Sequence, residues 1–376
     1  MTKQEHALNF IDKMLQPELR PRIQQLIEKK RTTGPIVVEF DPTTACNFEC
    51  PECINAGLLN KGQFKPSRAI EMIEEFNKVG VRGVIFIGGG EPLAHKGMPE
   101  PIVRASELGM SVGLTTNGSL IDRYFLELAE HVAWTRVSVD AATQETFSTF
   151  RPSHIPNSFS KIMRNMEVLA KIKKGILGFS FLLMERRLPN GETVTNADEV
   201  LAAAKLAEEI GCDYFEFKPM VDDNHNLIPF SEKVRESLEG QLQQLPELNS
   251  GNFRVIAPAS VQHLLSSVSS DQPKDYTTCP VLELRTVVTP KGIYPCPYKR
   301  GHEEEKIGEV DTPFDKYWPS DERHNRAQSI NPSTDCMFYC IRHQPNVLLH
   351  MLSGAHDKGL DLLPYMVETN LDDVFI

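Results

Sequence analysis

Three cysteines lie close together near the start of the chain, in the spacing Cys-x3-Cys-x2-Cys. They are Cys46, Cys50 and Cys53. Three thiolates on so short a segment can hold three corners of a [4Fe–4S] cube and leave the fourth iron open to a ligand that is not protein. A zinc site usually takes four ligands, and a disulfide framework takes an even number of cysteines. The spacing therefore favours a cluster with an open iron, and the alternatives are a zinc knuckle or buried thiols.

A glycine-rich stretch ends the apolar run that follows these cysteines. It consists of Gly88, Gly89, Gly90 and Glu91, and Pro92 comes directly after it. Glycines at the end of a strand let the backbone approach a ligand closely. The carboxylate of Glu91 can accept a hydrogen bond from an ammonium group. A glycine-rich turn alone is weak evidence of a cofactor pocket. Its position at the end of the strand that follows the three cysteines makes the evidence strong.

Together these two features resemble the radical S-adenosylmethionine (SAM) superfamily. The resemblance implies that Cys46, Cys50 and Cys53 are the catalytic cluster ligands and that Gly88–Glu91 holds the amino group of SAM. In that superfamily an electron passed to SAM gives methionine and a 5′-deoxyadenosyl radical. The position of Phe48 is often apolar in these enzymes and shields the cluster. Glu52 departs from the family pattern, which usually has an aromatic residue there.

The resemblance continues at later strand ends. It assigns further SAM contacts to Thr116, Asn117, Ser138, Asp140 and Arg151. Residues 116–118 match a Thr-Asn-Gly stretch of the family, with a simple Asn-Gly turn as the alternative. Ser138 matches a contact to the ribose, and Asp140 points the same way along the strand. The fork of Arg151 suits the SAM carboxylate, and a surface or N-cap arginine is the alternative.

A second set of cysteines occurs late in the chain, around a predicted hairpin. It consists of Cys279, Cys296, Cys336 and Cys340. This set resembles the C-terminal auxiliary-cluster domain of SPASM and Twitch radical SAM enzymes, in the shorter form with a single auxiliary cluster. Four thiolates would saturate a second [4Fe–4S] cluster, which suits electron transfer, whereas a structural zinc site is the alternative. Cys212 falls at the opposite rim of the predicted sheet and is expected to be structural.

Short apolar runs alternate with helical patterns from residue 35 onward, which predicts a parallel sheet with helices outside. We count six such units, so the expected α/β fold is a partial (β/α)6 TIM-like barrel rather than a closed eight-fold one. Ser67 is expected to cap the first of these helices. The six expected strands are Ile36–Phe40, Gly83–Ile87, Ser111–Thr115, Thr135–Asp140, Ile176–Leu183 and Asp213–Lys218.

The barrel is expected to lie between two smaller parts. Residues 1–34 form an N-terminal helical extension in which Leu8, Ile11 and Leu15 share one face. Residues 35–235 form the barrel. Residues 236–376 form the auxiliary-cluster domain, a cysteine-rich hairpin followed by a helix.

Composition narrows the classes of function and partner. The chain has 376 residues, is 40% hydrophobic and carries a formal charge of −11, which argues against a general nucleic-acid binder. The sequence shows no signal peptide and no apolar run long enough for a membrane helix. We expect a cytoplasmic protein with reduced cysteines and no membrane partner. The resemblance implies a small-molecule substrate and an electron donor of the flavodoxin or ferredoxin type.

The favoured function is a radical SAM oxidoreductase that dehydrogenates a sugar, nucleotide sugar or aminocyclitol, with the second cluster accepting an electron. A ribosomal-peptide maturase is one alternative, although only 45 residues precede Cys46, few for a peptide-recognition domain. Another is an enzyme that epimerises its substrate or forms a carbon–carbon bond. An alternative outside catalysis is an iron–sulfur electron carrier or a zinc-stabilised binding protein. Residues 298–300 can meet an anionic group, but a solvated loop is the favoured interpretation there.

Overall fold

A nine-stranded sheet organises the fold of this computed structural model. The structure describes residues 10–222, 225–258, 260–261, 265, 274–336, 340–366 and 374–375. The strand order is β11-β10-β1-β2-β3-β4-β5-β8-β9, and all neighbours are parallel except β10 and β11. The strands are β1 (Val37–Phe40), β2 (Gly83–Phe86), β3 (Ser111–Thr116), β4 (Trp134–Ser138), β5 (Ile176–Leu183), β8 (Tyr214–Pro219), β9 (Arg254–Ile256), β10 (Arg285–Thr289) and β11 (Gly292–Tyr294).

The expected partial barrel is confirmed, and each of its six strands is present with ends within two residues of those expected. A parallel sheet needs a crossover between successive strands, which the helical segments supply. The structure adds strands beyond the six. β9 pairs with β8, and the late hairpin of β10 and β11 joins the same sheet through β1. A small antiparallel pair, β6 (Glu185–Arg187) and β7 (Thr193–Thr195), lies outside this sheet.

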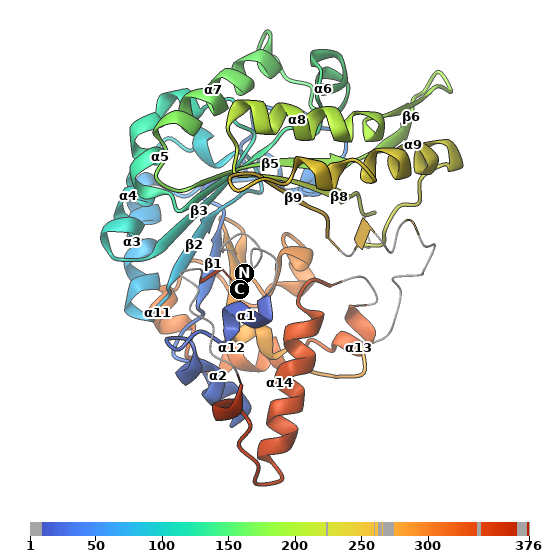
Figure 1. Ribbon diagram of the computed structural model, residues 1–376. Coiled ribbons are helices and arrows are strands. Elements are labelled where there is room, and N and C mark those ends of the chain that lie inside the picture. Colours follow the sequence, from blue (N-terminus) through green and yellow to red (C-terminus); the bar gives the residue numbers. More distant parts are fainter. Residues whose placement is uncertain are drawn as a thin grey trace.

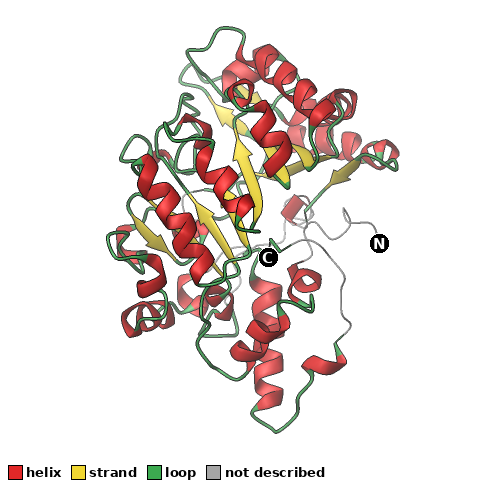
Figure 2. Cartoon of the chain, turned by 90° about the vertical axis from the view of Figure 1, so that its left-hand side faces the viewer, coloured by secondary structure: helices red, strands yellow, loops and turns green. Residues whose placement is uncertain are grey.

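Helices cover the outer face of the curved sheet, as Figures 1 and 2 show. Alternate residues of each strand face them, so Val38 and Phe40 of β1 are fully buried in the outer core while Glu39 faces the interior. The covering helices are α3 (Pro66–Lys78), α4 (Glu100–Glu107), α5 (Phe125–His131), α6 (Gln144–Phe150), α7 (Ser158–Ile172) and α8 (Val200–Ile210).

The N-cap expected at Ser67 is wrong. The cap residue of α3 is Lys65, and it makes no side-chain capping hydrogen bond. Pro66 follows as the first helical residue, where its fixed φ suits the helix and its missing N–H costs nothing. The proline therefore sets the start of the helix two residues earlier than a cap at Ser67 would.

Most of the remaining elements lie on the open, concave side of the sheet or along its far edge, whereas the short helix at Phe314–Tyr317 packs on the outer helix α3. Figure 1 shows the C-terminal helices gathered below the barrel together with the two N-terminal ones. The helices are α1 (Phe10–Met14), α2 (Arg20–Ile27), α9 (Glu232–Leu242), α11 (Phe314–Tyr317), α12 (Asp321–Gln328), α13 (Pro332–Asp335) and α14 (His343–His356). Short 3₁₀ turns connect elements throughout: η1 (Ala56–Leu58), η2 (Pro92–Ala94), η3 (Ile121–Arg123), η4 (Ala197–Glu199), η5 (Leu245–Leu248), η6 (Pro280–Glu283), η7 (Pro297–Lys299), η8 (Glu303–Glu305) and η9 (Leu363–Tyr365).

The expected N-terminal helices are present as α1 and α2, while Leu8 lies outside the described residues. These helices and residues near the C-terminus close the bottom of the barrel. The ring of Phe375 packs edge-on against Trp134, with centroids 5.5 Å apart. The ammonium of Lys13 donates a hydrogen bond to the Phe375 carbonyl at 3.1 Å. Because these segments cover the amino ends of the strands, we expect the functional site at the carboxyl ends.

Candidate functional site

The first cysteine set lies on the loop that leaves the carboxyl end of β1, as expected. Cys46, Cys50 and Cys53 are half-buried, and Phe48 between them is buried. The ring of Phe48 packs edge-on against Phe147 of α6, with centroids 6.0 Å apart. The pKa of Cys46 is raised to about 11, mainly by burial and in part by nearby Glu91 and the other two thiols. The three thiols and Glu91 are therefore neighbours.

Glu91 joins three parts of the site. Its carboxylate accepts hydrogen bonds from the Thr116 hydroxyl and the Asn117 main-chain N–H, both at 2.7 Å, and from the main-chain N–H of Leu93 at 3.1 Å. Its own main-chain N–H donates to the carbonyl of Ala45 at 2.8 Å. Burial raises the pKa of the Glu91 carboxyl, and these donors oppose the rise. A carboxylate offers about four acceptor sites, so one remains for a ligand.

Tight packing leaves no room for a Cβ at two of the three glycines before Glu91, and one of the two, Gly90, packs against the cysteine loop. A Cβ on Gly90 would lie 2.3 Å from the carbonyl oxygen of Ala45, and one on Gly88 would lie 1.9 Å from the Gly90 carbonyl oxygen. The N–H of Gly89 donates to the buried carboxylate of Asp41 at 2.8 Å. Gly90 thus packs closely on the cysteine loop, whereas the close approach of this stretch to a ligand stays a prediction.

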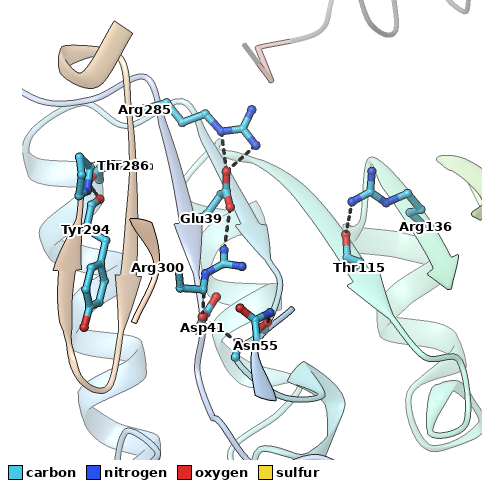
Figure 3. A network of polar contacts seen from close by, with 12 residues as sticks. Glu39, Asp41, Asn55, Thr115, Arg136, Arg285, Thr286, Tyr294 and Arg300 are labelled. Carbon is cyan, nitrogen blue, oxygen red and sulfur yellow. Dashed lines mark hydrogen bonds and ion pairs between the residues drawn. The ribbon is translucent and has the colours of Figure 1, made fainter. Parts of the chain in front are cut away.

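Two asparagines that sequence reasoning missed also fix this loop. The amide of Asn47 donates to the Ser119 hydroxyl at 2.8 Å and accepts from the amide of Asn117 at 2.9 Å. The amide of Asn55, just past the third cysteine, donates to the Gly88 carbonyl at 2.8 Å (Figure 3). The signal in the sequence that could have identified them was an amide side chain next to, or close to, a cysteine expected to bind metal. Its partners lie dozens of residues away, so only the fold reveals them.

Arg151 and Asp140, expected as separate SAM contacts, form an ion pair with each other. Asp140 adopts a left-handed φ of 62° just after β4, and its carboxylate also accepts from the Leu182 N–H at 2.6 Å. Burial lowers the pKa of Arg151, but Asp140 and the thiols of Cys50 and Cys46 outweigh it and raise that pKa. Arg151 therefore lies beside the cysteine loop. Neither the surface nor the N-cap alternative holds, because its side chain is only 15% exposed and it follows the end of α6.

Ser138 ends β4 at the same rim. It is half-buried and stands in register with Ser180 of β5. Val137 and Val139 on either side are fully buried in the outer core, so Ser138 faces the barrel interior.

The second cysteine set gathers on the concave side of the sheet. Cys279 precedes η6, Cys296 follows β11, Cys336 follows α13, and Cys340 precedes α14. The pKa of Cys336 is raised to about 12, mainly by burial and in part by the Cys296, Cys340 and Cys279 thiols. All four thiols therefore lie close together. The amide of Asn346 contacts the Cys279 sulfur at 3.2 Å. The helical turn expected to join Cys336 to Cys340 includes residues 337–339, which lie outside the described residues.

A buried polar network lies between the two cysteine sets, inside the barrel (Figure 3). Glu39 accepts hydrogen bonds from Arg285 at 2.9 Å and from Arg300 at 2.7 Å, and Arg342 approaches to 3.8 Å. Arg300 also lies 3.2 Å from Asp41. The solvated loop favoured for residues 298–300 is therefore wrong for Arg300, because the carboxylates of β1 draw its guanidinium into the interior.

Comparison with known proteins identifies the fold and the family. Residues 40–185, which run from the end of β1 to the start of β6, match the Radical SAM superfamily. SuiB of Streptococcus suis bound to S-adenosylmethionine has a similar structure, with a TM-score of 0.61 and 14% sequence identity over 83% of this chain and 72% of that one. Residues 40–185 of the chain therefore carry a radical SAM domain.

Curated relatives of this radical SAM protein differ in the activities that their names describe. The AdoMet-dependent heme synthase of Methanosarcina barkeri is 28% identical over 48% of this chain and 49% of its own length. The mycofactocin maturase MftC of Mycobacterium ulcerans is 24% identical over 81% of both chains. The first relatives found are each matched over half of their length or less.

A radical SAM domain implies a [4Fe–4S] cluster and SAM, and the donor set fits them. Within the described ranges, no three His, Cys, Asp or Glu side chains converge on one ion position. In a cubane each thiolate binds a different iron, so ligands surround the cluster. Three half-buried thiols on one short loop, beside a buried carboxylate with a spare acceptor site, suit that arrangement.

Two residues of the radical SAM protein have structural explanations. Glu52, at the position where the family usually has an aromatic residue, forms an ion pair with Arg186 of β6 at 2.8 Å. Cys212 is buried beneath α8, as expected for a structural thiol. None of the helices in the described part of the chain has the length and apolar character needed to cross a bilayer.

Proposed function

We propose that this protein cleaves SAM reductively, removes a hydrogen atom from a small polar substrate and completes a net two-electron oxidation. The observation that carries the proposal is that both cysteine sets adjoin the same buried network. Asp41 of that network accepts from Gly89 beside the first set. Arg342 donates to the Pro295 carbonyl, next to Cys296 of the second set, at 3.2 Å.

The first set would hold the SAM-binding cluster, whose chemistry with SAM supplies a 5′-deoxyadenosyl radical. The spare acceptor site of Glu91 suits the amino group of SAM. Arg151 suits its carboxylate, because a buried guanidinium beside the thiols strongly favours an anion. Phe48 keeps water from the loop. The remaining contacts proposed for SAM are Gly88, Gly89, Gly90, Thr116, Asn117, Ser138 and Asp140.

The second set, Cys279, Cys296, Cys336 and Cys340, would hold an auxiliary [4Fe–4S] cluster that supplies an acceptor for one electron. On this proposal a carbinol carbon of the substrate loses a hydrogen atom, then a proton and one electron, and becomes a ketone. The proposed domain boundaries, with residues 236–376 as the auxiliary part, go with this role. A flavodoxin- or ferredoxin-type protein would deliver the initial electron.

The substrate proposed is a sugar, nucleotide sugar or aminocyclitol, because the barrel interior beneath the cysteine loop is lined by charged and hydroxyl side chains. The test is anaerobic turnover of the reconstituted protein with a panel of these compounds. A ketone product with one 5′-deoxyadenosine formed per turnover supports the proposal. Regeneration of SAM as a catalyst, with no net consumption, would contradict it.

A ribosomal-peptide maturase is the second candidate, favoured by the match to mycofactocin maturase over 81% of this chain. The two candidates separate by what stimulates SAM cleavage. The dehydrogenase should form 5′-deoxyadenosine faster when a small polyol is added. A maturase should not respond to any such compound but should respond to a peptide.

A further inference from the structure

The barrel interior has an excess of positive charge that the chain as a whole does not share. The chain carries a formal charge of −11. Five cations nevertheless share the interior with only three carboxylates. The cations are Arg136, Lys218, Arg285, Arg300 and Arg342, and the carboxylates are Glu39, Asp41 and Glu216.

These charges fall into two groups. The first is the network around Glu39 and Asp41, in which Arg285 and Arg300 make hydrogen bonds or ion pairs of 2.7–3.2 Å. The second lies across the barrel on β4 and β8. There Arg136 and Lys218 both lie near Glu216, and the nearby carboxylate of Asp140 is already paired with Arg151, so this group has an excess of positive charge.

Arg136 is the deeper cation of the second group, on the interior face of β4. It donates to Glu216 at 3.3 Å and to the Thr115 hydroxyl at 3.4 Å (Figure 3). Both contacts are long for hydrogen bonds of a guanidinium, which has five donors in total. Its Nε is buried and has no hydrogen-bond partner in the described part of the chain. Arg136 therefore retains donors for a ligand.

Lys218 is the second cation, two residues past Glu216 on the same face of β8. It is half-buried and makes no hydrogen bond or ion pair with the residues that the structure describes. Glu216 and, to a smaller extent, Asp140 raise the pKa of Lys218, while Arg136 and burial lower it, and the net shift is downward. An anion placed between the two cations would relieve their mutual repulsion.

Hydroxyl groups complete this part of the interior. Ser138 and Ser180 stand in register on β4 and β5, the two strands that precede β8 in the sheet. The side chains beside Ser180, Phe179 and Phe181, are buried in the outer core, so Ser180 faces inward with Ser138. Hydroxyls are suitable donors to carboxylate or phosphate oxygens.

We propose that Arg136 and Lys218 form an anion subsite that binds a carboxylate or phosphate group of the substrate. The inference rests on the proposed function and narrows its substrate class. A sugar phosphate, nucleotide sugar or sugar acid fits this subsite, whereas a cationic aminocyclitol does not. Arg136 also holds Glu216 in place, so the two cations and the acid act as one site.

The experiment is calorimetric titration of the reconstituted, SAM-loaded protein with three matched probes: glucose 1-phosphate, glucuronate and glucose. Both anionic probes should bind more tightly than glucose, and the tighter of the two identifies phosphate or carboxylate as the preferred group. Lys218→Gln and Arg136→Gln should each weaken anion binding by about tenfold, since a hydrogen bond to a charged group is lost. If Arg136→Gln does not fold, Arg136→Lys, which keeps the charge, takes its place in the titration.

The matched control is Arg104→Gln, which removes an arginine from the outer helix α4, where it pairs with Glu74. It should leave all three affinities unchanged. Equal binding of glucose and the anionic probes, or equal losses in Lys218→Gln and Arg104→Gln, would overturn the subsite. Formation of 5′-deoxyadenosine without substrate, measured on the same preparations, separates this failure from failure of the proposed function.

Discussion

Arg300 donates a hydrogen bond from its guanidinium to the carboxylate of Glu39 at 2.7 Å, although 261 residues separate them in the chain. Glu39 lies on β1, whose carboxyl end leads into Cys46, and Arg300 lies shortly after Cys296. This pair therefore fixes the second cysteine set against the strand that carries the first. The account of function depends on that arrangement.

Glu39→Gln should strongly destabilise the protein, because it leaves Arg285 and Arg300 buried without their main carboxylate. Breaking a buried pair by removing one partner typically costs about 3–5 kcal/mol of unfolding free energy. The measurement is the urea midpoint of the reconstituted protein. Glu74→Gln, which removes the partner of Arg104 on the surface, is the control and should cost less than about 1 kcal/mol. Similar midpoints for both variants would show that the network contributes little.

Asn47→Ala should slow SAM cleavage without unfolding the protein. The change removes the amide contacts to Ser119 and Asn117, so the cysteine loop loses its connection to the end of β3. With each hydrogen bond contributing about 1 kcal/mol, we expect a loss of roughly tenfold in the rate of 5′-deoxyadenosine formation. Asn190→Ala, at the exposed tip of the β6–β7 hairpin, should have no effect. Equal rates of 5′-deoxyadenosine formation in the two variants would show that Asn47 does not contribute to SAM cleavage.

Arg151→Gln should weaken SAM binding more than it lowers the rate at saturating SAM. Its guanidinium is buried beside the cysteine loop and is proposed to pair with the SAM carboxylate. We expect about a tenfold rise in the dissociation constant for SAM, measured by equilibrium binding. Arg164→Gln on the exposed face of α7 is the control. An unchanged dissociation constant for SAM would mean that Arg151 pairs with Asp140 and does not bind SAM.

Asp41 should make stability fall as the pH rises toward neutrality. Burial, together with the charge of Glu39, raises the pKa of Asp41 from 3.8 to about 7, although Arg300 and the Gly89 N–H oppose the rise. The folded protein therefore holds a proton that the unfolded chain releases above pH 3.8, and this stabilisation is lost between about pH 4 and 7. Relative to Asp41→Asn, wild-type stability should fall by up to about 1.4 kcal/mol per pH unit in that window and level off above it. Parallel unfolding curves at pH 5.5, 6.5 and 7.5 would contradict the assignment.

The sequence predicted those parts of the fold and site that depend on local pattern. The six strands of the barrel follow from apolar runs that alternate with helical faces. The placement of Glu91 next to Cys46 follows because parallel strands bring their carboxyl ends to one edge. The burial of Phe48 agrees with the family resemblance, in which this position is often apolar and shields the cluster.

The rest depends on contacts between distant segments. Arg300 stands in a polar run that is typical of a surface loop, and only the pairing of β10 with β1 brings it to Glu39. Asn47 has no recognisable motif, because its partners come from the loop after β3. Arg136 and Lys218 belong to alternating strand patterns, and their shared interior becomes visible only when β4, β5 and β8 are placed in register.

Metal analysis of the anaerobically reconstituted protein tests the central claim most directly, because that claim is two iron–sulfur sites on one barrel interior. Wild type should contain about eight irons and eight sulfides per chain, as two cubanes require. A variant with Cys46, Cys50 and Cys53 changed to Ala should keep about four, and one with Cys279, Cys296, Cys336 and Cys340 changed to Ala should also keep about four. About four irons and one zinc in wild type would contradict the account, because the second site would then be structural.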